Sequence, residues 1–224
     1  MSFLGEADKR FIQSIGFLTG LCIVFYAFRV AVSQSFRFGF VFENLALAWL
    51  GLIFGWLLVK NLHKKRWLSW QNIGLSILWV LFLPNTWYVL TDFLHVLPTG
   101  EVSQLYDIVF ISILVINGFV LGFTSLFLVH QELRKRFSEQ KAYAVVAVVI
   151  LLSSFAIFLG RDLRWSSWDI ITNPSGLILN VSDRFIDPFG HRQAFNVTGL
   201  FFVLISSAYF AIWSFIRPAN PRGK

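Results

Sequence analysis

Six apolar stretches, each about 20 residues long, constrain this chain more than any other feature. A helix needs about 20 consecutive apolar residues to cross the hydrocarbon core of a bilayer. Only helices satisfy their own backbone polar groups in lipid, and none of the stretches alternates as the strands of a membrane barrel do. The sequence therefore predicts an all-α membrane protein, a six-transmembrane-helix bundle. Its spans are residues 11–32, 41–60, 70–91, 105–129, 142–160 and 195–216.

The composition supports this placement. Hydrophobic residues make up 56% of the 224 residues and charged residues only 14%, against roughly 25% charged in soluble domains. The 26 Phe and 9 Trp suit a surface that faces lipid, with Trp at the interfaces. Because every connection except the fifth is short, we expect one transmembrane domain over residues 1–224.

The Lys and Arg residues are unequally divided between the connections. The side with both terminal segments and the even-numbered connections holds 13 of the 19, including Lys64 and Lys135, when residues at the adjoining span ends are counted. The side with the odd-numbered connections holds 8 of the 12 acidic residues. Basic loops stay in the cytoplasm, so we expect both termini there and the odd-numbered connections outside. This bias explains the formal net charge of +7, and we expect no nucleic-acid partner.

Glycine and proline suggest how the spans pack. The first stretch is longer than the 7–15 apolar residues of a signal peptide, so we expect a retained anchor. Pro84 predicts a kink or a frayed end near the outer end of the third span. Gly-x-x-x-Gly pairs let a partner backbone approach closely, either inside one bundle, the interpretation we favour, or in a homo-oligomer. Such pairs are Gly16/Gly20, Gly51/Gly55 and Gly118/Gly122.

The fifth connection, residues 161–194, contains a helical pattern. The pattern predicts an amphipathic helix that lies flat on the outer membrane surface or folds over the end of the bundle. Trp165 and Trp168 suit an interfacial anchor on the same side. The apolar residues recur every four positions: Leu177, Val181, Phe185 and Phe189.

Polar residues gather at the predicted outer ends of the spans. Arg29 ends the first span, and Glu43 and Asn44 open the second. The predicted cytoplasmic ends carry only scattered Lys and Arg. We therefore expect an outward-facing polar site. Its candidate ligand-binding residues are Asn85, Tyr88, Asp92, His95, Asp107, Arg161, Arg164, Trp165, Trp168 and Asp169.

Three segments resemble a known family. Residues 83–92 (LPNTWYVLTD), the pair Tyr106-Asp107 and residues 160–169 (GRDLRWSSWD) are similar to signatures of the domain-of-unknown-function family 1361. The resemblance covers nearly the whole chain and departs from the family pattern at Trp87, Asp162 and Ser166. It implies a bacterial multi-pass membrane protein, which we expect in the plasma membrane, and it implies no reaction.

The candidate residues allow several kinds of site. Asp92 and His95, three residues apart, would share a helix face and could bind a metal with Glu43, Asp107 or Asp169. This spacing is weakly specific and no metal-hydrolase motif is present, so we predict no metal and no cofactor.

Two further interpretations involve the arginines. Asp92 or Asp107 could pair with Arg161 or Arg164, which would hold the loops to the bundle. Alternatively, both arginines could bind a lipid headgroup or a small anionic molecule, with the neighbouring Trp side chains as a flat contact surface.

These interpretations favour a binding or accessory membrane protein for a small anionic or lipid-like ligand, with the lipid bilayer as its environment. The alternative is a membrane-embedded enzyme that acts on lipid-linked or envelope substrates, although no Gly-x-Ser-x-Gly motif is present. A transporter ranks third, because Asn117 and a few Ser and Thr are the only polar groups near the middle of the spans.

Overall fold

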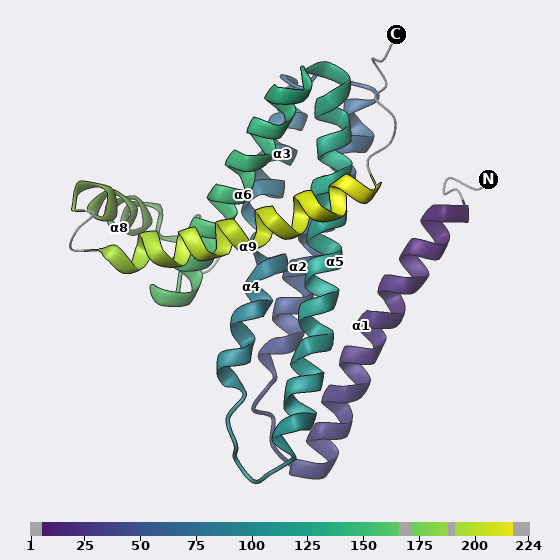
Figure 1. The fold of residues 1–224 in the computed structure, drawn as a ribbon, viewed down its shortest axis with the longest axis vertical. Coiled ribbons are helices and arrows are strands. Elements are labelled where there is room, and N and C mark those ends of the chain that lie inside the picture. The colour runs from purple at the N-terminus through teal and green to yellow at the C-terminus, as the bar shows by residue number, and fades with distance from the viewer. Residues whose placement is uncertain (1–5, 166–171, 188–190, 217–224) are drawn as a thin grey trace.

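The computed structural model describes residues 6–165, 172–187 and 191–216, and within these ranges the chain is helical and has no strand (Figure 1). Six helical segments are long and apolar enough to cross a membrane. The predicted six-span membrane bundle is therefore confirmed. The helices are α1 (Glu6–Ser33), α2 (Phe40–Leu62), α3 (Trp70–Phe82), α4 (Asn85–Tyr88), the 3₁₀ helix η1 (Val89–His95), α5 (Gln104–Arg136), α6 (Glu139–Asp162), α8 (Pro174–Ile186) and α9 (Arg192–Ile216).

Helix α5 is the central element. At 33 residues it is about 50 Å long, and it packs against α1, α2, α4 and α6. Helix α2 also contacts α3, and α9 packs on α6, which it crosses obliquely in Figure 1. The core between these helices is apolar and aromatic, with Leu83, Trp87 and Tyr209 almost completely buried.

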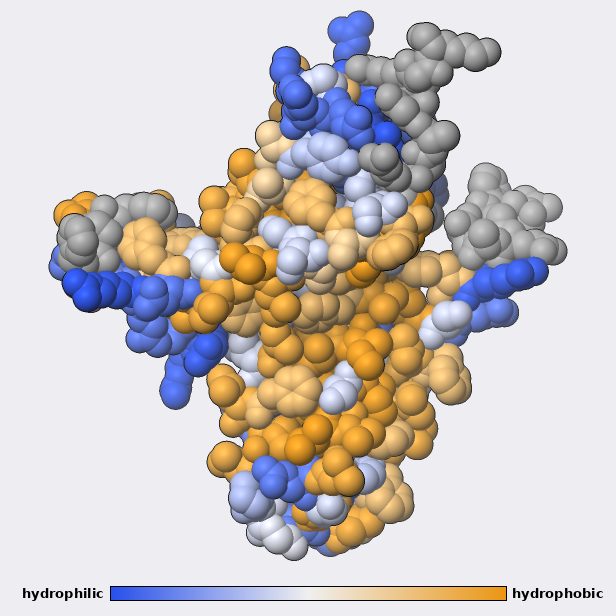
Figure 2. Space-filling view, viewed as in Figure 1, coloured by the Kyte–Doolittle hydropathy of each residue, from blue (hydrophilic) through white to orange (hydrophobic). Residues whose placement is uncertain are grey.

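The two ends of α5 differ in chemistry. At its last turn, Arg136 Nη2 donates to the carbonyl of Leu62 (3.1 Å), so the basic connections after α2 and α5 meet there. At its first turn, Asp107 contacts Arg29 at the other end of the bundle. In Figure 2 the middle of the bundle is mainly apolar, and hydrophilic residues lie at its two ends and at its sides, around α8 and the start of α1. This is the surface expected of a helical bundle that crosses a bilayer.

The third span changes its winding at Pro84. Helix α3 ends at Phe82, and the chain continues as α4 and then as η1 up to His95. Proline has no N–H to donate, and the amide of Thr86, two residues later, bonds to the carbonyl of Leu83 only three residues back (3.1 Å). The helix is thus interrupted at the proline, and the span extends beyond residue 91. In a 3₁₀ helix, residues three apart lie above one another, so Asp92 and His95 share a face as predicted.

Two of the three glycine pairs pack inside the bundle. A Cβ added at Gly51, Gly55, Gly118 or Gly122 would lie 3.1 Å or less from a neighbouring atom. For these pairs the interpretation as internal packing is confirmed. Gly16 and Gly20 of α1 are different, because a Cβ at either position would meet nothing within 4 Å.

A helix is present in the fifth connection. Asn173 caps α8 by accepting a hydrogen bond from the amide of Gly176 (3.1 Å), and Pro174 occupies its first turn, where the missing N–H has no consequence. In Figure 1, α8 lies beside the start of α9, at the side of the bundle. Its position on an outer membrane surface stays a prediction. Phe189, Trp168 and Asp169 lie outside the described residues.

Candidate functional site

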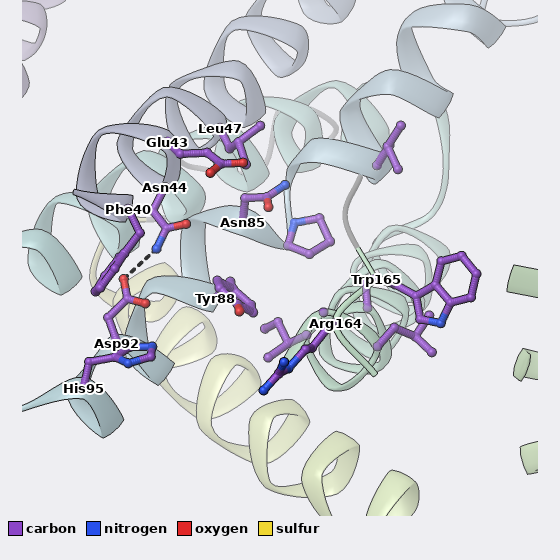
Figure 3. Close-up of a pocket in the computed structure, with 16 residues that line it drawn as sticks. Phe40, Glu43, Asn44, Leu47, Asn85, Tyr88, Asp92, His95, Arg164 and Trp165 are labelled. Atoms are coloured by element: carbon purple, nitrogen blue, oxygen red, sulfur yellow. Dashed lines mark hydrogen bonds between the residues drawn. The ribbon is translucent and has the colours of Figure 1, made fainter. Parts of the chain in front are cut away.

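A cavity of about 500 Å³ lies between the start of α2, the segment that follows Pro84, and the end of α6 (Figure 3). One part of its wall is polar and the other is apolar. The polar lining residues are Glu43, Asn44, Asn85, Tyr88, Asp92, His95 and Arg164. The other lining residues are Phe40, Leu47, Leu81, Pro84, Ala156, Ile157, Leu159, Gly160 and Trp165.

Six of the ten predicted site residues line this cavity. They come from two segments of the chain, the one that follows Pro84 and the one that ends α6. The packing of α4 against α6 brings these segments together. The six are Asn85, Tyr88, Asp92, His95, Arg164 and Trp165.

Asp92 is the most buried charged group of the cavity, with 2% of its surface exposed. Its Oδ2 accepts a hydrogen bond from Asn44 Nδ2 (2.8 Å; Figure 3). In the described part of the chain, no Lys, Arg or His lies within 4.0 Å of this carboxylate, and its Oδ1 receives no hydrogen bond. A buried carboxylate is costly unless it is paired or fully hydrogen-bonded. Asp92 is therefore a candidate to meet a ligand.

The residues around Asp92 are held in place by neighbouring helices. Arg37 donates to the carbonyl of His95 (2.9 Å), and the His95 ring lies against Phe40, with 4.9 Å between the ring centroids. Tyr88 packs on the end of α6, where a Cβ at Gly160 would lie 3.2 Å from its ring. The glycine therefore permits the close approach of the Tyr88 ring.

Arg164 occupies an unusual backbone position. Helix α6 ends with a hydrogen bond from the Trp165 amide to the carbonyl of Leu159 (3.2 Å), six residues back. Helices commonly end with one residue in the left-handed conformation, and that residue is usually glycine. Here that residue is Arg164, with φ of 57°. A side chain at such a position costs roughly 1–2 kcal/mol, and this one is exposed and lines the cavity.

Asp107 is not part of this cavity. Its two oxygens accept hydrogen bonds from Arg29 Nε (2.8 Å) and Nη2 (3.3 Å), and both residues are buried. The hypothesis that Asp107 pairs with Arg161 or Arg164 is therefore wrong. The sequence did not reveal this pair because it depends on helix packing. Helix α1 packs against α5 and places Arg29 beside Asp107.

Arg29 is further enclosed by its surroundings. Its Nη2 also contacts Glu101 Oε2 (3.1 Å), and its guanidinium lies 4.5 Å from the centre of the Phe38 ring. Arg29 is fully buried in this cluster and does not line the cavity. The only sequence signal for the pair of Arg29 and Asp107 was that an arginine and a carboxylate lie at the predicted outer ends of two different spans.

The remaining predicted residues divide into two groups. Arg161 is exposed and is not among the cavity-lining residues, and Trp168 and Asp169 lie outside the described residues. Glu43 and Asn44, absent from the predicted site, do line the cavity. Their position at the start of α2, at this polar end of the bundle, was the sequence signal for Glu43 and Asn44.

Over the residues described, no three His, Cys, Asp or Glu side chains form a group that could hold a metal ion.

Comparisons with known proteins give one match. The model of the family described as "Protein of unknown function (DUF1361)" matches residues 43–208. That segment includes every residue that lines the cavity except Phe40. No curated protein and no solved structure matches the chain. Because the matched segment covers most of the sequence, the chain belongs to the DUF1361 family.

Proposed function

We propose that this chain is a single-domain membrane protein of the bacterial plasma membrane, with an outward-facing cavity that binds a small anionic or lipid-like ligand. The cavity itself carries the proposal. Its volume of about 500 Å³ falls in the range typical of small-molecule sites, roughly 300–1,000 Å³. Like such sites, it combines apolar walls with a few polar groups.

Arg164 is the anion-binding candidate. A guanidinium matches the geometry of phosphate and carboxylate groups, and this one is exposed at the cavity wall. Its left-handed backbone would be less strained with glycine. Non-glycine residues persist in such conformations mainly at functional sites, which supports a role for the Arg164 side chain beyond folding.

The apolar wall favours a lipid-like ligand over a small hydrophilic anion. Leu47, Leu81, Ile157 and Leu159 line the cavity together with the polar residues. They belong to helices that cross the membrane. An acyl chain could lie against these residues while its headgroup contacts Arg164.

Lipid binding to purified protein tests this proposal. We expect phosphatidylglycerol to raise the thermal unfolding temperature, and Arg164→Gln to weaken its binding by about tenfold or more, the effect of losing one charge-assisted hydrogen bond. Arg192→Gln is the matched control, because Arg192 is also exposed and does not line the cavity. Equal losses in both variants, or no stabilisation by any lipid, would contradict the proposal.

Cysteine labelling tests the orientation. Cys22 is the single cysteine and is buried, so Cys22→Ala provides a background for new thiols. We expect a membrane-impermeant thiol reagent to label Glu101→Cys in intact cells and to label Lys64→Cys only after lysis. External labelling of Lys64→Cys would show that the cavity does not face outward.

A further inference from the structure

We infer that the ligand of this cavity is an aminophospholipid, an amphiphile whose headgroup carries a primary amine beside its phosphate. This inference rests on the proposed function and narrows it to one chemical class. It follows from the charges on the cavity wall, which are of both signs.

The acidic part of the wall comes from α2 and η1. Asp92 contributes a buried carboxylate whose only hydrogen bond from the described residues is that of Asn44. Glu43, the residue before Asn44, contributes a second carboxylate and is exposed. A purely anionic ligand would meet both like charges, which is unfavourable. A primary ammonium has three donors and no acceptor, so it could fill the unused acceptor positions of both carboxylates.

The basic part of the wall comes from the end of α6. Arg164 enters there, and in Figure 3 Tyr88 lies between Arg164 and Asp92. The lining thus holds a guanidinium on one side and two carboxylates on the other. A zwitterionic headgroup complements this arrangement, with its phosphate at Arg164 and its ammonium at Asp92 and Glu43.

An aromatic ring adds to the acidic part of the wall. Phe40 lines the cavity and is held against His95, with 4.9 Å between the ring centroids. Cations are attracted to the faces of aromatic rings. An ammonium bound near Asp92 would therefore gain a further favourable contact that a neutral headgroup would not.

A pair of lipids that differ only in the amine gives the sharpest test. Phosphatidylethanolamine and phosphatidylethanol share the phosphate and acyl chains, and only the first carries an ammonium. By native mass spectrometry of detergent-purified protein, we expect phosphatidylethanolamine to bind about tenfold more tightly. Glycerophosphoethanolamine, which has the headgroup without acyl chains, should bind at least tenfold more weakly than the lipid, since it buries no apolar surface.

Variants of the cavity lining test whether the two carboxylates cause the preference for phosphatidylethanolamine over phosphatidylethanol. Glu43→Gln and Asp92→Asn should each reduce the preference for phosphatidylethanolamine, and the anionic phosphatidylethanol should bind as tightly as before or more tightly because one like charge is removed. Arg164→Gln should weaken the binding of both lipids. Glu43→Gln keeps the test valid if Asp92→Asn does not fold, because the Glu43 side chain is exposed.

The outcomes separate this inference from the proposed function. Equal binding of the two lipids, with Arg164 required for both, would overturn the amine preference and leave the proposed function standing. Binding of glycerophosphoethanolamine as tightly as the lipid would overturn the lipid class. Binding of none of the three would overturn both proposals.

Discussion

Asp107 and Asp92 are two buried carboxylates with opposite surroundings. Their exposed fractions are 1% and 2%, so burial does not distinguish them. Asp107 accepts two hydrogen bonds from Arg29, which also contacts Glu101 and Phe38. Asp92 accepts one hydrogen bond, from a neutral amide, and lines a cavity. A carboxylate closed by its own ion pair holds helices together, whereas one that is left with a neutral partner beside a cavity is available to a ligand.

The family match includes all of the Asn44–Asp92 pair but only one member of the Arg29–Asp107 pair. It begins at Glu43 and so includes Asn44, Asp92 and Asp107, but not Arg29. The ion pair therefore joins α1 to the matched part of the chain. The cavity, in contrast, is built almost completely within that part.

The largest effect is expected from opening the ion pair. Arg29→Met leaves Asp107 buried without its cation, which we expect to lower the free energy of unfolding by about 3–5 kcal/mol. Equilibrium unfolding of the purified protein in detergent measures this change. The double variant Arg29→Met/Asp107→Leu should recover most of the loss, because replacing both members of a buried pair by apolar residues is often neutral. A single-variant loss below 1 kcal/mol would mean that the pair is dispensable.

A smaller loss is expected at the cavity. Asn44→Leu removes the hydrogen bond to Asp92, and we expect it to lower the free energy of unfolding by about 1–3 kcal/mol. Asn44→Leu/Asp92→Leu should restore much of the stability by the same unfolding measurement. If Asn44→Leu cost as much as Arg29→Met, the two carboxylates would have equivalent structural roles.

A modest gain in stability is expected from removing backbone strain. Arg164 and Gln34 are both non-glycine residues in the left-handed conformation, with φ of 57° and 54°. Substitution of either by glycine should raise the free energy of unfolding by about 1 kcal/mol. Only Arg164→Gly should also weaken lipid binding in a titration. Unchanged lipid binding in both variants would remove Arg164 from the site.

The smallest effect on stability is expected from Asp92→Asn. The amide has nearly the same shape and can still accept the hydrogen bond from Asn44, so the free energy of unfolding should change by less than about 1 kcal/mol. Asp107→Asn, the matched substitution, should cost about 3 kcal/mol because the buried Arg29 then keeps only the partly exposed Glu101 as a counter-charge. Similar costs at both positions would erase the contrast between them.

The spans could be predicted well because their signal is local. All six predicted stretches coincide with helices, although several helices continue further than predicted. Helix α5 extends past residue 129 to Arg136, where Glu132 forms ion pairs with Lys135 and Arg136. Such pairs, three and four residues apart, support a helix after the apolar stretch has ended. Apolar content alone does not register this continuation.

The site was predicted less completely. The polar residues at the predicted outer ends of the spans included Asn85, Tyr88, Asp92 and His95, which line the cavity. The same signal also selected Asp107, which does not line the cavity, because it marks a carboxylate beside a cavity and an ion-paired carboxylate alike. Asp92 and Asp107 are the same residue type and lie at similar positions at the ends of their predicted spans. They differ in the side chain that each one contacts, which the sequence does not reveal.

Apolar length, charge bias and the proline by themselves determined that this protein is a six-span helical bundle with hydrophilic ends and an interruption in its third span. Each of these features acts within one helix or at one membrane surface, so its effect can be derived without knowing the other helices. Only the tertiary structure decided that Arg29 meets Asp107, that Asn44 meets Asp92, and that two glycine pairs face inward while the third does not. Those choices depend on the rotation and crossing of packed helices, which bring together residues that are far apart in the chain, such as Arg29 and Asp107, 78 positions apart.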